Sequence, residues 1–193
     1  RGAKGFRSHK GYLYEGGIRV PFIARRPGVV PAGRTNAQIL SFQDVLPTVL
    51  DAAGAGSRTP RDVDGASVLP VIEGRPGPSA ADRIFYMEFP AYGGQQMARR
   101  GKWKAVRQNL LRDPGAPVEL YDLEADPGET ADVAAAHPAV VADLMAIMAR
   151  AREMQQALVG RTIAAIEVRQ PKCLNVPEAQ FREALVGGRT LGV

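Results

Sequence analysis

Cysteine is nearly absent from this chain of 193 residues, which has Cys173 alone, and there are only two histidines, His9 and His137. A single thiol can form neither an internal disulfide nor a structural zinc site of paired cysteines. Neither histidine lies near a nucleophile motif such as G-x-S-x-G, which the sequence lacks, so no Ser-His-Asp or Cys-His catalytic arrangement is recognisable. Cys173 is interpreted as structural.

Long apolar runs are also missing, because no stretch of about 18 apolar residues occurs and no transmembrane helix is therefore expected. The first residues, beginning at Arg1, include neither an initiating Met nor a signal-type apolar stretch. We expect the sequence to come from inside a longer chain. Nothing in it determines a cellular location.

The residues that are present suit a globular protein. Apolar side chains make up 45% of the chain and charged ones 23%, which excludes a disordered or low-complexity protein. The 21 glycines and 15 prolines show no repeating period, so they indicate many turns and short elements. The net charge of +5 is spread along the chain and names no partner by itself. We expect a loop-rich α+β domain.

The pattern predicts three parts, residues 1–82, 83–159 and 160–193. In the first part, apolar residues over 18–23, interrupted by Pro21, predict an edge strand. Ser41 can cap a helix whose apolar residues recur at helical spacing and predict packing against the core, namely Val45, Leu46, Val49 and Leu50. Residues 54–82 are rich in turn formers and are interpreted as connection.

The second part predicts a small antiparallel sheet. Strands are expected near residues 84–89, 96–99, 102–107 and 118–121, joined by short turns. A long helix is expected from Pro138 to Gly160, covering one face of the sheet with one apolar stripe: Val140, Leu144, Ile147, Ala151, Met154 and Leu158. In the third part, a β-branched patch at 162–168 and a short helix at 177–186 are expected.

Two charged stretches resemble functional sites, a calcium loop and a nucleic-acid contact, but their residues do not fit these sites. The acidic run 122–129 resembles the start of a calcium loop, but Pro127 and Val133 stand where such a loop needs glycine and a bidentate acid. A solvated turn is the better interpretation. The basic residues around Trp103 resemble a nucleic-acid contact, but strand alternation predicts Trp103 in the core and the flanking Lys102 and Lys104 on a solvent face. No nucleic-acid partner and no membrane partner are expected.

The glycine-bordered segment of residues 9–21 is the most informative. Lys10 is a cation in a loop with backbone N–H groups nearby, which suits contact with a sulfate or phosphate oxygen. Gly16 and Gly17 allow a sharp turn or a close backbone approach, and Glu15 and Arg19 can pair or tie the loop to the next element. A solvated turn remains the alternative at this point.

An ordered series of motifs resembles the C-terminal part of a sulfatase of the arylsulfatase type, in the alkaline-phosphatase-like superfamily. The motifs run in family order as Lys10-Gly11 with Tyr14-Glu15-Gly16-Gly17-Ile18-Arg19-Val20-Pro21 and Pro27-Gly28, then Asp44 to Leu50 with Ala53-Gly54, Asp64 to Leu69, Lys102-Trp103-Lys104, and Glu119 to Leu123 with Asp126-Pro127-Gly128-Glu129. The resemblance covers roughly residues 5–158.

The resemblance implies an enzyme that hydrolyses sulfate esters with a formylglycine nucleophile beside a bound Ca²⁺ ion. The formylglycine motif, C/S-x-P-x-R, does not occur here, and the calcium ligands are expected before Arg1, so no metal ligand is assigned in this chain. Lys10 matches the family lysine that contacts the sulfate group, His9 is a lesser candidate for substrate contact, and Glu15 and Arg19 match positions interpreted as loop supports.

The resemblance therefore implies a C-terminal fragment of a sulfatase, inactive alone, whose partners are a sulfate ester and the missing N-terminal part of the same protein. A periplasmic or secreted parent is an expectation at family level. Two alternatives stay open: a phosphoester or phosphonate hydrolase of the same superfamily, and a non-catalytic anion-binding module.

Overall fold

The computed structural model describes residues 5–77, 79 and 83–169, with side chains described only as far as residue 154. The chain divides into two compact units, Arg1–Ala151 and Arg152–Val193. The first unit contains the sheet and every candidate site residue. The three-part division expected from the sequence stays a prediction, and the expected helix at 177–186 and Cys173 lie outside the described residues.

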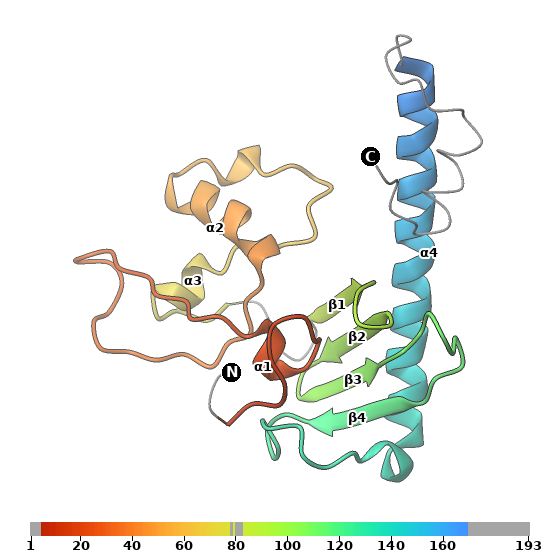
Figure 1. Cartoon of the computed structure of the whole chain (residues 1–193). Helices are drawn as coiled ribbons and strands as arrows, with labels where there is room; N and C mark the ends of the chain where they lie inside the picture. Colours follow the sequence, from red (N-terminus) through yellow and green to blue (C-terminus); the bar gives the residue numbers. More distant parts are fainter. Residues whose placement is uncertain (1–4, 78, 80–82, 170–193) are drawn as a thin grey trace. The chain divides into compact units, whose positions relative to one another are not determined.

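A four-stranded antiparallel sheet is the centre of the first unit (Figure 1). Its strands lie side by side in sequence order: β1 (Ile84–Phe89), β2 (Gln95–Arg100), β3 (Trp103–Arg107) and β4 (Val118–Asp122). Arg100 pairs with Trp103 across the two-residue turn at Gly101, which has φ +55°. The predicted strands are confirmed within two residues at each end, because alternation and turn residues act locally.

One face of the sheet is covered by the first part of the helix α4 (Pro138–Arg169), over residues 140–148 (Figure 1). The buried residues of this layer are small or aliphatic: Ala98, Ala105 and Leu120 from the sheet, and Leu144 and Met148 from the helix. Val140 and Ile147 pack around them, which confirms the predicted stripe there. Its expected member Met154 is instead 69% exposed. The α+β fold class, a small antiparallel sheet packed by a long helix, is thus confirmed.

The end of α4 differs from the prediction. The helix continues through Gly160 to Arg169, so the expected stop at Gly160 is wrong and the β-branched patch at 162–168 is helical. A glycine inside a helix costs only about 1 kcal/mol relative to alanine. Ala164, Ala165 and Glu167 are good helix formers, and they lie between the β-branched residues.

The opposite face of the sheet is covered by the segment that ends in the short helix α1 (Glu15–Ile18) (Figure 1). A second core cluster fills this layer: Leu13, Tyr14, Phe85, Met97, Val106, Tyr121 and Leu123. Because both faces are covered, the predicted solvent face with Lys104 on it is wrong, and Lys104 has no exposed surface. Among the described residues, no helix is long and apolar enough to cross a membrane.

The expected edge strand at 18–23 is not formed. Ile18 ends α1, and the residues after it pair with no strand among the described parts of the chain. Pro21 removes one N–H donor. Val20, Phe22 and Ile23 are exposed, Ile23 by 90%, so this segment presents apolar side chains to the outside.

The helix α2 (Val45–Ala52) ends where the sequence predicted, before Gly54 at φ +70°. It begins later than expected, because Ser41 precedes a 3-10 turn at Phe42–Asp44 and the α-helix starts only at Val45. Its predicted packing is wrong, because Val45, Leu46 and Val49 are exposed and the residues buried are Pro47 and Thr48. Short helical turns follow at Gly56–Arg58 and at α3 (Leu69–Ile72), and another, Ala134–Ala136, precedes α4.

Polar contacts hold α2 to its neighbours. The buried carboxylate of Asp44 accepts hydrogen bonds from the Ala66 N–H at 3.0 Å and the Ser41 N–H at 2.8 Å, and it pairs with Arg83 at 2.5 Å. Burial acts to raise the pKa of Asp44, but these hydrogen bonds and the Arg83 charge outweigh it, so the pKa is lowered. The buried Thr48 hydroxyl accepts a bond from the Val68 N–H at 3.0 Å.

Candidate functional site

Lys10 lies at the corner of a tight turn. The Tyr12 N–H donates to the His9 carbonyl oxygen at 3.1 Å, and Gly11 inside the turn has φ +100°, in the region that favours glycine. The side chains of His9 and Lys10 are exposed. The two candidate substrate contacts, Lys10 and His9, therefore share one turn at the surface.

Gln95, at the start of β2, fixes the backbone of this turn. Its side chain is buried, its Nε2 donates to the Gly11 carbonyl oxygen at 2.8 Å, and its Oε1 accepts from the Leu13 N–H at 3.1 Å. A buried amide that both donates to and accepts from one loop leaves that loop little freedom to shift. The backbone that bears the Lys10 side chain is thus fixed to the sheet by hydrogen bonds from Gln95.

Close packing explains the glycines of the loop. A Cβ atom on Gly11 would lie 2.4 Å from Cε2 of Tyr92, and one on Gly17 would lie 2.0 Å from the carbonyl oxygen of Tyr12. A Cβ on Gly16 would meet the carbonyl oxygen of Arg7 at 2.4 Å. Of the two uses expected for Gly16 and Gly17, close backbone approach is the one observed, and it leads into a helix instead of a strand.

A buried ionic cluster joins α1 to the sheet. The Lys104 ammonium lies 2.9 Å from Oε1 of Glu15 and 2.8 Å from Oε1 of Glu129, and all three residues are at most 1% exposed. The other oxygen of Glu129 accepts a hydrogen bond from the Glu15 N–H at 2.6 Å. One buried cation from β3 thereby connects the first turn of α1 with the loop that follows β4.

Two arginines complete the charge balance around Glu15. Arg19 pairs with its carboxylate at 2.5 Å, one helical turn away, and Arg99 of β2 lies 3.7 Å from it. Burial acts to raise the pKa of Glu15, but Lys104 and Arg19 outweigh it, so the pKa is lowered. For Glu129, burial prevails over the Lys104 charge and raises the pKa. The assignment of Glu15 and Arg19 as loop supports stays a prediction, with these contacts as its physical basis.

The residues that precede the turn are held by Arg7. Its guanidinium lies 4.0 Å from the centre of the Tyr14 ring, donates to the Tyr121 hydroxyl and lies 3.4 Å from the Glu119 carboxylate. Burial and hydrogen bonding to Glu119 raise the pKa of both tyrosines. Each tyrosine therefore remains a neutral hydrogen-bond donor.

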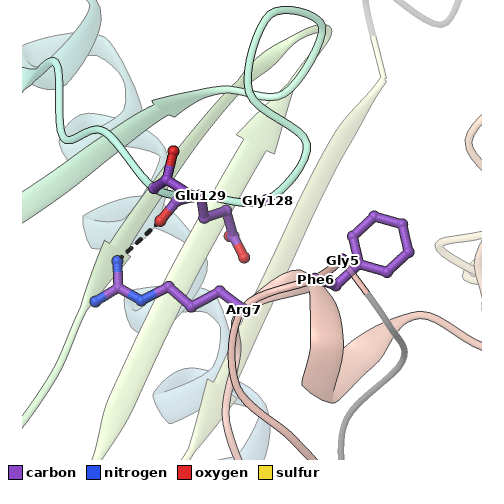
Figure 2. A pocket seen from close by; sticks show the side chains of 6 residues that line it. Gly5, Phe6, Arg7, Gly128 and Glu129 are labelled. Atoms are coloured by element: carbon purple, nitrogen blue, oxygen red, sulfur yellow. Dashed lines mark hydrogen bonds between the residues drawn. The ribbon is translucent and has the colours of Figure 1, made fainter.

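An open cleft of about 500 Å³ lies beside this arrangement, lined by Gly5, Phe6, Arg7, Gly128, Glu129 and Thr130 (Figure 2). Arg7 points across it and donates to the backbone oxygen of Glu129 at 3.2 Å (Figure 2). Phe6 lies against the Arg19 guanidinium at 4.4 Å. Since Arg7 is already engaged by several partners, we assign no ligand to this cleft.

The described residues do not fit a calcium site. No group of three or more His, Cys, Asp or Glu side chains among them is arranged to hold a metal ion. Asp126, in the acidic run, accepts hydrogen bonds from the backbone N–H groups of Thr130 and Ala131, at 2.6 Å and 2.9 Å. That run is only partly a solvated turn, because Glu129 at its end is fully buried. No metal ligand is therefore assigned to the part of the chain that the structure describes.

The sequence interpretation missed Lys104, Glu129 and Gln95. A signal for Lys104 was present, since alternation places Lys104 on the same face of β3 as Val106, and a valine on that face indicates that the face is covered. The pairing of Lys104 with Glu15, 89 positions earlier in the chain, had no local signal.

Comparison with known proteins identifies the class. The fold resembles that of Ps i-CgsB, solved in complex with k-i-k-neocarrahexaose, with a TM-score of 0.65 and 26% identity over 94% of this chain and 36% of that one. The ulvan-active sulfatase of Formosa agariphila is 33% identical over 151 residues, covering 61% of this chain and 29% of the enzyme. Human arylsulfatase A is 34% identical over 142 residues, which cover 64% of this chain and 27% of arylsulfatase A. These are sulfatases of the alkaline-phosphatase-like fold.

Residues 2–156 match the family model described as N-sulphoglucosamine sulphohydrolase, C-terminal. The chain belongs to this family of C-terminal sulfatase domains, which confirms the resemblance recognised in the sequence. It spans less than a third of the length of the two curated relatives, 29% and 27%.

Proposed function

We propose that this chain forms one wall of the substrate cleft of a sulfate ester hydrolase and that Lys10 contacts the sulfate group of the substrate. The main support for this proposal is that the Lys10 side chain is exposed while the buried side chain of Gln95 hydrogen-bonds to the backbone beside it. A cation in a fixed position stabilises the negative charge that develops on the transferring oxygens without reorganising during the reaction. His9, in the same turn, is proposed as a second substrate contact.

The remaining machinery is proposed to come from the N-terminal part of the parent enzyme. A formylglycine hydrate there would supply the attacking oxygen beside a calcium ion, as the family resemblance implies. The exposed apolar side chains of Val20, Phe22 and Ile23 support a partner of this kind, since apolar surface gathered on one segment marks an interaction site. Alone, this chain is proposed to be inactive.

Reading the coding sequence upstream of Arg1 is the first test. An in-frame Cys- or Ser-x-Pro-x-Arg motif supports the proposal. An in-frame stop followed by a start codon near Arg1 contradicts it and favours the non-catalytic anion-binding module.

The role of Lys10 is tested in the full-length protein. Lys10→Ala should lower kcat by on the order of 10², the usual effect of losing one electrostatic donor. Lys102→Ala is the matched control, because Lys102 pairs with Asp122 at 2.6 Å and lies in the turn between β2 and β3. Near-normal turnover of Lys10→Ala would remove Lys10 from the mechanism. Faster hydrolysis of an aryl phosphate than of an aryl sulfate would favour the phosphoester hydrolase alternative.

A further inference from the structure

Tyr92 lies directly beside the Lys10 turn. It belongs to the loop between β1 and β2, and the missing side chain of Gly11 leaves the space that its ring edge occupies, since a Cβ there would be 2.4 Å from Cε2 of Tyr92. Gly11 follows Lys10 in the chain. The ring of Tyr92 therefore lies against the residue next to the proposed sulfate contact.

Tyr92 is held in an unusual backbone conformation. Its φ is +54°, in the left-handed region that non-glycine residues seldom adopt, and Gly93 and Gly94 after it also have positive φ values. Such strain persists only where the surroundings impose it, and it gathers at ligand-binding and catalytic sites. Here the imposed conformation brings a large aromatic side chain to the surface beside Lys10.

The ring of Tyr92 has aromatic neighbours and remains accessible. It stacks on Tyr12 with ring centres 5.0 Å apart, and Tyr12 meets His9 edge-on at 5.2 Å. The ring centre of Phe89 lies 6.5 Å from that of Tyr92. Tyr92 nevertheless stays 57% exposed. A tyrosine that served only to pack the loop would gain more by burying its ring.

We propose that Tyr92 forms a subsite for the leaving group of the sulfate ester, in which a six-membered ring of the substrate lies on the exposed surface of the tyrosine ring while Lys10 contacts the sulfate. This inference rests on the proposed function. Sugar pyranoses and aryl groups share the chemistry that fits, a ring face of C–H bonds or π electrons, and an aromatic side chain stabilises either one by close contact. An acyclic alcohol presents no such face.

The test compares esters within one preparation of the full-length enzyme. The kcat/KM of a ring-bearing ester, glucosamine 6-sulfate or 4-nitrophenyl sulfate, is divided by that of the acyclic choline sulfate. Tyr92→Ala should lower this ratio about tenfold, mainly through KM, the effect expected from one stacking contact and its buried area. The ratio does not depend on the folded fraction of the sample, or on a displacement of Lys10 that slows all esters alike.

Two further variants sharpen the comparison. Tyr92→Phe keeps the ring and should keep the ratio. Leu111→Ala removes another exposed side chain, 71% exposed, from the loop that bonds back to Gly93, and it should leave the ratio unchanged. Whichever ring-bearing ester loses more in Tyr92→Ala identifies the ring as a pyranose or an aryl group. An unchanged ratio for both in Tyr92→Ala overturns the inference.

A binding measurement separates this inference from the proposed function. Calorimetry of glucosamine 6-sulfate and of phenyl sulfate needs no turnover, and Tyr92→Ala should weaken the Kd of at least one of them about tenfold. Equal Kd values in the variant and the wild type overturn the Tyr92 subsite alone. Failure of the proposed function would show itself differently, as no binding of either ester to the wild type or as normal turnover of Lys10→Ala, and the subsite that rests on it would fall too.

Discussion

The two faces of the sheet are held by different kinds of interaction. The α4 face is an apolar layer in which Ala98, Ala105 and Leu120 meet Leu144 and Met148. The α1 face combines an apolar cluster with buried charge, because Lys104 lies there between Glu15 and Glu129. Apolar contacts are non-directional, whereas buried charges and hydrogen bonds require defined positions.

This difference matches the structural role of each face. The α4 face only has to exclude water, and a helix can shift slightly on it without losing much burial. The α1 face has to place one particular turn, residues 9–12, and it does so with the Gln95 amide and the buried ionic cluster. A buried ion pair is weak evidence for stability, but it can specify a unique arrangement.

The largest expected effect comes from removing the charge at the centre of the α1 face. Lys104→Met keeps the length of the side chain but leaves Glu15 and Glu129 buried without their shared cation. We expect the free energy of unfolding of the full-length protein to fall by about 4 kcal/mol, measured by urea denaturation. The fraction that stays folded should also show a lower kcat, because α1 and the Lys10 turn lose their anchor.

Lys102→Met is the matched control for this substitution. Lys102 and Asp122 form an ion pair near the surface, with Lys102 39% exposed, and such pairs contribute about 0–1 kcal/mol. Equal losses in the two variants would mean that the buried cluster does not distinguish the α1 face.

A cavity in the α4 face should reduce stability somewhat less and leave the chemistry alone. Leu144 is 1% exposed, and Leu144→Ala should lower the free energy of unfolding by about 3 kcal/mol. The kcat of the folded fraction should match the wild type, because the Lys10 turn lies on the other face. Met154→Ala, at a position 69% exposed on the same helix, should change stability by no more than about 0.5 kcal/mol. If the folded fraction of Leu144→Ala had a kcat as low as that of Lys104→Met, the two faces would not be independent.

The smallest effect is a pH dependence confined to the α1 face. The pKa of Glu129 is raised above its ordinary value of 4.5, so its contribution to folding stability grows as the pH falls toward 4.5. The pKa of Glu15 is lowered below 4.5, so its contribution is present above 4.5 and is lost as the pH falls further.

Difference curves against single variants isolate these two carboxylates. The stability of the wild type minus that of Glu129→Gln should grow as the pH falls toward 4.5, and the same difference for Glu15→Gln should shrink below 4.5. The curve for Leu144→Ala should stay flat, since that substitution changes no charge. If the Glu129→Gln difference instead shrinks as the pH falls toward 4.5, the pKa direction assigned to Glu129 is wrong.

The sequence predicted the α4 face far better than the α1 face. Strand alternation and the helical spacing of Val140, Leu144 and Ile147 are local patterns, and a meander of adjacent strands needs no long-range information. The motif series located the Lys10 turn but not what holds it. Gln95 and Lys104 read locally as ordinary polar strand residues, and only the placement of a distant segment over the sheet buries them.

The failures at residues 18–23 and in α2 share a physical cause. Apolar side chains at strand or helix spacing were interpreted as facing a core within this chain, but Ile23, Val45 and Val49 are exposed. Periodicity indicates that a face is apolar, and it does not say which neighbour covers that face.

The contact between Glu15 and Glu129 also affects the order of events during synthesis, because 114 positions separate the two residues. At a translation rate of 5–20 residues per second, roughly 6 to 23 s pass between the emergence of the two ends of that hydrogen bond. For most of that interval, until β1 to β3 have been synthesised, the glycine-rich Lys10 turn has no sheet on which to fold. Translation or folding conditions that delay the β2–β4 hairpins should prolong its exposure to proteases and chaperones, and the proposed sulfate contact should be among the last features of the nascent chain to form.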